Sequence, residues 1–176
     1  MKPPAHRIDA QPVLVRATDP AWDLDRLDAE LDSLDPAERS AHPWAAYMAA
    51  GTRYDLHADA GNGSAADYLR PGSEPVAWTL RRLSVTQMAR VQDMFSREIR
   101  REGESSLYEV WVECVRCGLE DVTGPGAPRL EHRQGKLTEA SLSEIHDHCG
   151  GLAALAEIGA AIFHLSQPLT DAEKKR

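Results

Sequence analysis

The chain has 176 residues, of which 42% are hydrophobic and 27% are charged, and its formal net charge at pH 7 is -8. These values are those of an ordinary globular protein. They exclude a wholly disordered chain and allow one domain with an addition, or two very small domains. An acidic surface repels phosphate groups, so nucleic acid is not expected as a partner.

The cellular location follows from three further features. The longest apolar run, over residues 150–165, is interrupted by Glu157 and His164, so neither a membrane-spanning segment nor a membrane partner is expected. The first ten residues lack the apolar stretch of a secretory signal. Three cysteines, an odd number, agree with a reducing compartment. We therefore expect the protein in the cytoplasm.

Residues 1–22 are dotted with prolines and are expected to form an extended arm. The apolar residues Val13, Leu14 and Val15 are expected to add a short strand, either to a sheet edge of the same chain or to a partner. These three residues are the first candidates for partner binding.

Residues 23–75 form an acidic leader. Eight acidic side chains lie between residues 19 and 38, against two basic ones, Arg26 and, one residue further on, Arg39. Four leucines recur at spacings of three, four and three residues, which places them on one helical face: Leu24, Leu27, Leu31 and Leu34. A narrow apolar stripe on an acidic helix is suited to docking either on the chain's own core or on another protein. The four leucines are the second set of candidate partner-binding residues.

The rest of the leader is expected to contain only short elements. Pro36 should end the first helix, because the residue before a proline disfavours the helical region. A second short helix is expected over residues 43–50, a brief strand over residues 53–57 and one helical turn over residues 65–69. With so little regular structure of its own, this part of the chain is expected to wrap the centre of the fold.

Residues 75–119 are expected to form that centre. Apolar residues alternate over residues 76–80, as they do in a half-buried strand. A capping box at Ser84 should open a helix that ends at Gly103, and a second helical stripe runs over residues 107–118. Two helices with a short break between them should pair as an antiparallel hairpin under the strand.

The segments after residue 119 carry the same kinds of signal for loops, strands and helices. A loop is expected over residues 123–128, and a strand around residues 130–132 should turn at residues 134–135. Thr138 should cap a helix that residues 150–151 break, before the strongest helical stripe of the chain.

The fold class expected from these elements is α+β and predominantly helical. A small antiparallel sheet or hairpin should pack on an antiparallel helical core, with an extended N-terminal arm. The expected division is the arm over residues 1–22, the acidic leader over residues 23–75, and a helical core domain with a small sheet over residues 76–176.

One group of residues has the composition of a zinc site: Cys114, Cys117, His146 and Cys149. Zinc takes about four such ligands in a tetrahedron, and two helices could each supply two of them. Cys114, however, shares its helical stripe with Trp111, and a free cysteine in a core behaves as a small apolar residue. Glu113 and Arg116 are expected to point away from that stripe. We expect core packing for Trp111 and Cys114, with no bound metal and no cofactor.

Catalysis by a cysteine or a histidine is a further alternative. Cys149 lies beside His146 and His148, but a nucleophilic thiol also needs a lowered pKa and an oxyanion pocket. The sequence shows no recognisable form of either requirement, so no catalytic residues are assigned and no enzyme activity is expected.

The order of several segments resembles that of a known family. An acidic, proline-marked leader precedes residues 78–84, which run into a helix, and a helical segment follows over residues 114–124. Residues 156–162, then residues 165–166, lead to a basic end. Over residues 76–176 this order resembles small tail-morphogenesis proteins of tailed bacteriophages, in particular tail assembly chaperones.

The resemblance implies an acidic, largely helical protein that is not an enzyme and that binds other phage structural or assembly proteins, or its own copies. It would work in the cytoplasm of the bacterial host. A related role, as a small head, neck or tail component, would place it in the virion. A zinc-stabilised interaction module and a cysteine or histidine enzyme are the alternatives from other classes.

Overall fold

The computed structural model describes residues 12–49, 63–100 and 107–167. Its elements run along the chain in the order β1 (Val13–Val15), α1 (Leu24–Ser33), α2 (Pro36–Ala41), α3 (Pro43–Ala49), η1 (Ala65–Tyr68), β2 (Ala77–Leu80), α4 (Val85–Ile99), α5 (Tyr108–Gly118), β3 (Leu119–Thr123), β4 (His132–Arg133), β5 (Lys136–Leu137), α6 (Glu139–Cys149) and α7 (Gly151–Ser166). The predicted class is confirmed, because the chain is mostly helical with a small antiparallel sheet. The predicted strand over residues 53–57 and Gly103 lie outside the described residues, and helix α4 ends at Ile99, before the expected end at Gly103.

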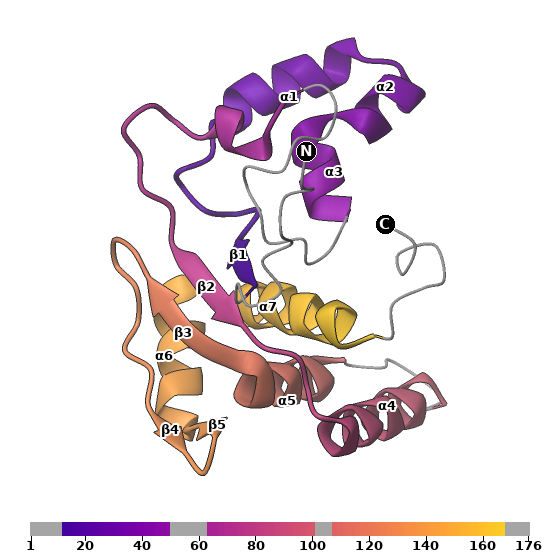
Figure 1. Cartoon of the computed structure of the whole chain (residues 1–176), viewed down its shortest axis with the longest axis vertical. Coiled ribbons are helices and arrows are strands. Elements are labelled where there is room, and N and C mark those ends of the chain that lie inside the picture. Colours follow the sequence, from indigo (N-terminus) through magenta and orange to yellow (C-terminus); the bar gives the residue numbers. More distant parts are fainter. Residues whose placement is uncertain (1–11, 50–62, 101–106, 168–176) are drawn as a thin grey trace, which may run out of the picture.

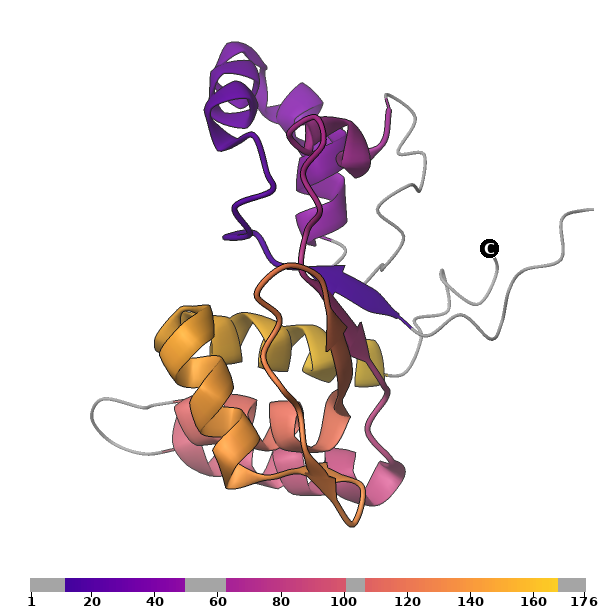
Figure 2. The same cartoon turned by 90° about the vertical axis from the view of Figure 1, so that its left-hand side faces the viewer.

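The elements divide into a small lobe and a larger body (Figure 1). Helices α1, α2 and α3, with η1, form the small lobe at one end of the long axis. The sheet and helices α4 to α7 form the body, with the helices against one side of the sheet, as the turned view in Figure 2 shows.

The three-stranded sheet has β2 at its centre and the order β1-β2-β3, and both pairs are antiparallel. Leu14 of β1 pairs with Trp78 of β2, and Trp78 pairs with Val122 of β3. The prediction that Val13–Val15 add to a sheet edge of the same chain is therefore confirmed.

Strand β3 is an element that the sequence does not predict, since a loop is expected only over residues 123–128. The helical segment expected over residues 114–124 is wrong in its second half, because α5 ends at Gly118 and β3 begins at Leu119. It follows α5 directly, with no linking residue between them. Its buried residues Leu119 and Val122 are three positions apart, because the ladder changes register between Thr79 and Leu80. The irregularity removes the alternation by which a strand is recognised.

The predicted turn at residues 134–135 is confirmed as the turn of a two-stranded hairpin, β4 with β5. Gln134 and Gly135 have φ values of 52° and 73°. Two left-handed residues in succession give the turn that matches the twist of a two-residue hairpin. The hairpin presents Arg133 directly opposite Lys136 in the ladder.

The core of the body is centred on α7, whose buried face includes Leu155, Ile158 and Ile162. Helix α5 packs most extensively on α7 and less on α4, so the expected α4–α5 pair exists but is not the main helix contact. None of the described helices is by itself long and apolar enough to cross a membrane. Helices α6 and α7 reach that length and composition only together, and they bend by 116° at the break between them, Gly150.

The small lobe has a core of its own. Its buried members are Val15, Trp22, Leu27, Tyr47, Ala65 and Tyr68. The indole of Trp22 is fully buried, donates a hydrogen bond to the carbonyl of Arg16 at 2.7 Å, and lies 6.4 Å from the ring of Trp44, centroid to centroid. The expectation that this part of the chain wraps the centre is therefore wrong: it forms a separate aromatic cluster (Figure 1).

Helix α2 is also absent from the sequence prediction. Leu34 ends α1, as the proline rule predicts, but Pro36 then occupies the first turn of a new helix. Asp35 caps it by accepting hydrogen bonds from the backbone amides of Ala37 and Glu38, and the Glu38 carboxylate accepts one from the Asp35 amide. A proline is favourable there, because the first helical residues need no amide donor.

The lobe and the body are joined by buried charged groups. The Arg16 guanidinium donates a hydrogen bond to the Glu157 carboxylate of α7, with Nε 3.3 Å from Oε2, and another to the carbonyl of Cys149 at the end of α6. Asp19 accepts a hydrogen bond from the Val76 amide, at 3.0 Å, just before β2. Arg16 and Asp19 are both more than nine-tenths buried, so each needs these partners.

The contact between α5 and α7 predicts the effect of one methyl group. A Cβ atom on Gly159 would lie 2.7 Å from the Trp111 carbonyl oxygen and 2.8 Å from its Cα, so backbone would have to move. At a helix position with free space around it, replacing glycine by alanine stabilises the protein by up to about 1 kcal/mol. Here we expect Gly159→Ala to destabilise by about 1–3 kcal/mol, as overpacking does, and to lower the thermal midpoint. The exposed position of Ala153 on the same helix provides the control, Ala153→Leu, which should melt with the parent; an unchanged midpoint for Gly159→Ala would contradict the α5–α7 packing.

Candidate functional site

The first set of predicted partner-binding residues lies inside the molecule. Leu14 and Val15 are buried, and Val13 is half-buried in the edge strand. The Val15 amide donates a hydrogen bond to the Tyr47 hydroxyl at 2.9 Å, and that hydroxyl lies 3.4 Å from the Val15 carbonyl oxygen. Burial raises the pKa of Tyr47 to about 12, so the hydroxyl keeps its proton. In this structure Val13–Val15 pair with a strand of the same chain. This is the first of the two expected roles, addition to a sheet edge of the chain itself and not to a partner.

The leucine stripe of α1 is divided between the two expected roles. Leu27 is buried in the core of the small lobe, and Leu31 and Leu34 are half-buried. Leu24 is the exposed member, with 40% of its surface accessible. The stripe therefore docks largely on the chain's own core, and only its first residue is open to a partner.

The other face of α1 carries acidic side chains on the surface. Asp25, Asp28 and Asp32 are exposed and recur at spacings of three and four residues, which places them on one face of the helix; we call these three residues the acidic face. Residues 23–41 carry seven acidic side chains against two basic ones, a net charge of -5 out of the chain's -8. More than half of the net charge is thus concentrated in helices α1 and α2 together with their capping residues Asp23 and Asp35.

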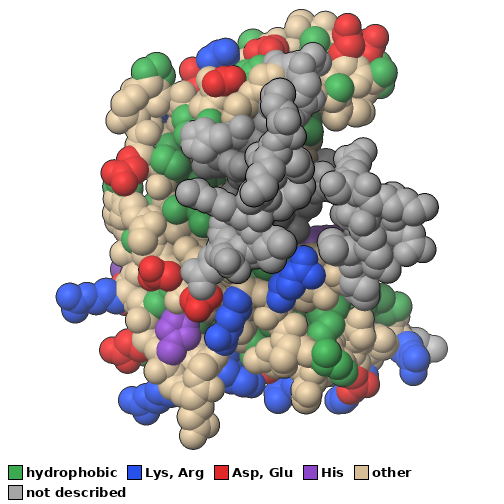
Figure 3. Space-filling model, in the orientation of Figure 1, with side chains coloured by type: hydrophobic (Ala, Val, Ile, Leu, Met, Phe, Trp, Pro, Cys, Tyr) green, Lys and Arg blue, Asp and Glu red, His purple; other side chains and the backbone are tan. Residues whose placement is uncertain are grey.

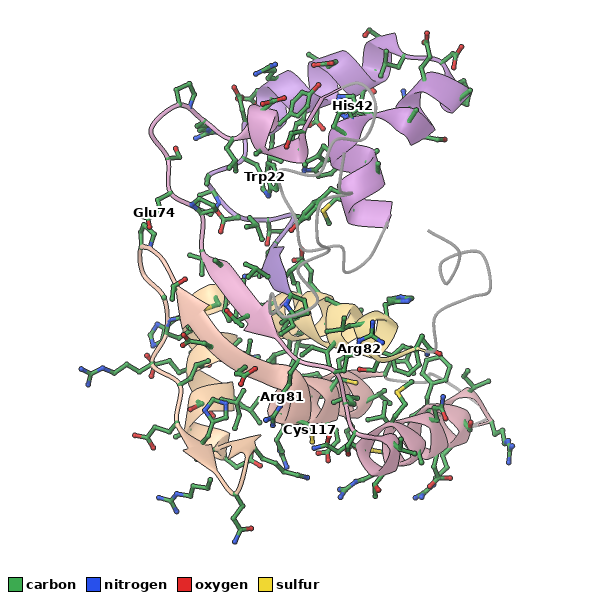
Figure 4. All side chains as sticks on the ribbon, in the orientation of Figure 1. Trp22, His42, Glu74, Arg81, Arg82 and Cys117 are labelled. Atoms are coloured by element: carbon green, nitrogen blue, oxygen red, sulfur yellow. The ribbon has the colours of Figure 1, made fainter. Side chains whose placement is uncertain are left out.

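Some carboxylates of this lobe serve its own structure. Glu30 accepts a hydrogen bond from the Tyr68 hydroxyl at 2.9 Å, and burial together with this carboxylate raises the pKa of Tyr68. His42 is buried against Tyr68, with ring centroids 4.7 Å apart, and Figure 4 labels it in the small lobe. Its Nε2 lies 3.4 Å from Glu30 Oε1, yet neither ring nitrogen forms a hydrogen bond with the described residues.

The four zinc candidates are not brought together. Cys114 and Cys117 are buried on α5, whereas His146 and Cys149 lie on α6. Among residues 12–49, 63–100 and 107–167, no three His, Cys, Asp or Glu side chains are placed to hold one metal ion. Burial raises the pKa of the Cys114 thiol to about 12 and also raises that of Cys149. A thiol that keeps its proton is a poor nucleophile and a poor metal ligand.

A charged cluster that the sequence does not predict surrounds Glu113. This carboxylate is expected to point away from the core, but its side chain is only 8% exposed. Its Oε1 lies 3.3 Å from Lys136 Nζ of β5 and 3.5 Å from Arg90 Nε of α4, and its Oε2 lies 3.9 Å from Arg116 Nη1. One buried negative charge is therefore shared by three cations from three elements. The side chain of Arg90 is mostly exposed, and that of Lys136 is partly exposed.

Arg81 extends this cluster beyond β2. Its Nε donates a hydrogen bond to the carbonyl of Cys117 at 2.9 Å, and its Nη2 donates one to the carbonyl of Gly135 in the hairpin turn. Figure 4 shows Arg81 beside Cys117. Together with Arg133, the partner of Lys136 across the hairpin, the cations form what we call the basic face: Arg81, Arg90, Arg116, Arg133 and Lys136.

The two charged faces lie at opposite ends of the molecule. Acidic side chains gather at the end formed by α1 and α2, and most of the basic ones lie at the other end (Figure 3). The five positive charges of the basic face bind the carboxylates of Glu113 and Glu139 in the described part of the chain, the latter 2.6 Å from Arg116 Nη2. The basic face is thus positive on an acidic protein.

Comparisons of the chain with protein-family models, with curated proteins and with solved structures found no match.

The burial of the cysteines predicts how they react. Cys114 and Cys117 should resist alkylation by iodoacetamide at pH 8 until the chain is unfolded, because the thiols are buried and protonated. For the same reason we expect substoichiometric zinc in native protein and an unchanged melting curve in the presence of a chelator. Mass spectrometry of labelled protein and metal analysis check both points. Stoichiometric zinc, lost together with the fold on chelation, would support the metal module instead.

Proposed function

We propose that this chain is a non-enzymatic bacteriophage or prophage morphogenesis protein that acts by protein–protein contacts, as a chaperone-like factor in tail assembly. The observation that carries the proposal is the separate acidic lobe. Seven carboxylates lie within 19 residues on a unit with its own core, projecting from the body at one end.

The lobe has the chemistry of a surface for a basic partner. Concentrated like charges oppose folding of the helix that carries them, and here the aromatic core offsets that cost. Such charge contributes mainly to steering a complementary partner and fixing its register. Leu24, exposed at the start of α1, adds an apolar contact beside the acidic face.

The site chemistry supports contact rather than catalysis. The thiols have pKa values raised by burial, and the carboxylate of Glu113 is occupied by three cations. The class of partner, other phage structural or assembly proteins, comes from the resemblance of residues 76–176 to tail-morphogenesis proteins. A second candidate within the same class is a small head, neck or tail component of the virion. The first role places the chain in the host cytoplasm, and the second places it in the particle.

The proposal is tested in a phage or prophage that encodes the chain. Deleting the coding sequence should abolish plaque formation and leave particles with missing or incomplete tails by negative-stain electron microscopy. The double substitution Asp28→Lys/Asp32→Lys, on the exposed acidic face, should reproduce that defect in a chain that still folds. Mass spectrometry of purified particles distinguishes the roles, because a chaperone is absent from the mature virion and a component is present. Normal particles after deletion would overturn the proposal.

A further inference from the structure

We propose that the basic face of one copy binds the acidic face of a second copy, so that the chain associates head to tail with itself. This inference rests on the proposed function only for the mode of action, protein–protein contact. It adds the identity of the partner, a second copy of the chain. The contact would bring Asp25, Asp28 and Asp32 of one copy against the cations around Glu113 of the next.

The cations of the basic face are held in position by contacts within the chain itself. The buried Glu113 carboxylate attracts Arg90, Arg116 and Lys136 to one place, and the carbonyls of Cys117 and Gly135 hold Arg81. The two carboxylates that bind these cations, Glu113 and Glu139, cannot neutralise all four of them, so part of their charge faces outward. Cations already held in place lose less conformational freedom on binding, which favours association.

The complement of this face is present on the same chain. Helix α1 offers three carboxylates at helical spacing, Asp25, Asp28 and Asp32, of which Asp32 also lies 3.7 Å from the guanidinium of Arg39. The basic face lies at the opposite end of the long axis, beyond the body (Figures 1 and 3). One molecule therefore cannot join its own two faces, and the contact must form between copies.

The arrangement fixes the kind of assembly. Two different surfaces that meet make a heterologous contact, which repeats from copy to copy and gives a ring if the rotation closes or an open chain if it does not. Because the faces are exposed, the attraction should depend on salt. The screening length falls from about 30 Å at 0.01 M ionic strength to about 10 Å at 0.1 M. Assembly should thus be extensive at low salt and weak at high salt.

Charge-swap variants test the contact. Purified full-length chain is examined by sedimentation velocity at ionic strengths of about 0.02 and 0.3 M, a range that spans the change in screening. The parent should form species larger than a dimer at the lower value and return to monomer at the higher. Asp28→Lys/Asp32→Lys should be monomeric at both, and so should Arg90→Glu/Arg133→Glu. An equimolar mixture of the two variants should assemble again. The unaltered basic face of one variant can bind the unaltered acidic face of the other, and the two substituted faces carry opposite charges.

Each outcome decides the proposal. The control Asp121→Lys/Glu144→Lys changes the net charge by the same amount as Asp28→Lys/Asp32→Lys, at exposed positions outside both faces, and it should assemble like the parent. Thermal melting checks that every variant is folded. A parent that is monomeric at low salt, or a mixture that does not assemble, overturns the contact. If the parent is monomeric and the deletion phage still lacks tails, this inference fails and the proposed function stands; a basic partner other than a second copy then occupies the acidic face.

Discussion

Strand β1 is the constraint on which both parts of the structure depend. Successive side chains of a strand point to opposite sides, and here the two sides are two different cores. Leu14 belongs to the core of the body, and Val15 belongs to the core of the small lobe. Arg16 returns to the side of Leu14 and reaches Glu157 and the end of α6. Three consecutive residues therefore tie the acidic lobe to the helical body, so neither core is complete without the arm.

These contacts explain how an acidic lobe can project from the body and still hold a fixed position relative to it. The guanidinium of Arg16 is buried and its charge is matched by Glu157, and Asp19 is satisfied by the Val76 amide. Buried charges with their partners in place favour one arrangement of the lobe over others, because any other would leave them unpaired. A fixed lobe keeps the acidic face at the far end from the basic face, and that separation is what a repeating contact between copies requires.

Local patterns in the sequence predict most of the helices. The features that these patterns miss depend on contacts between residues far apart in the sequence. Helices α4, α5 and α7 are found from their apolar spacing, and Ser84 forms the predicted capping box. Strand β3 is missed because a register change removes its alternation. The core of the small lobe is missed because its aromatic residues are scattered from Trp22 to Tyr68 and meet only in three dimensions. Glu113 looks like a surface residue on its helix, since the cations that bury it come from α4 and β5.

The most direct test of the coupling between the lobe and the body is differential scanning calorimetry of Arg16→Met. This substitution keeps an unbranched apolar side chain in place of the arginine stem and removes the charge and the hydrogen-bond donors. The parent should unfold in one transition. The variant should show two, with the small lobe melting first, because the Cys149 carbonyl loses the Arg16 donor and Glu157 keeps only the Ala17 amide. The matched variant Arg70→Met, at an exposed arginine, should keep the single transition. A single transition at the parent's midpoint in Arg16→Met would show that the lobe and the body are not coupled through this residue.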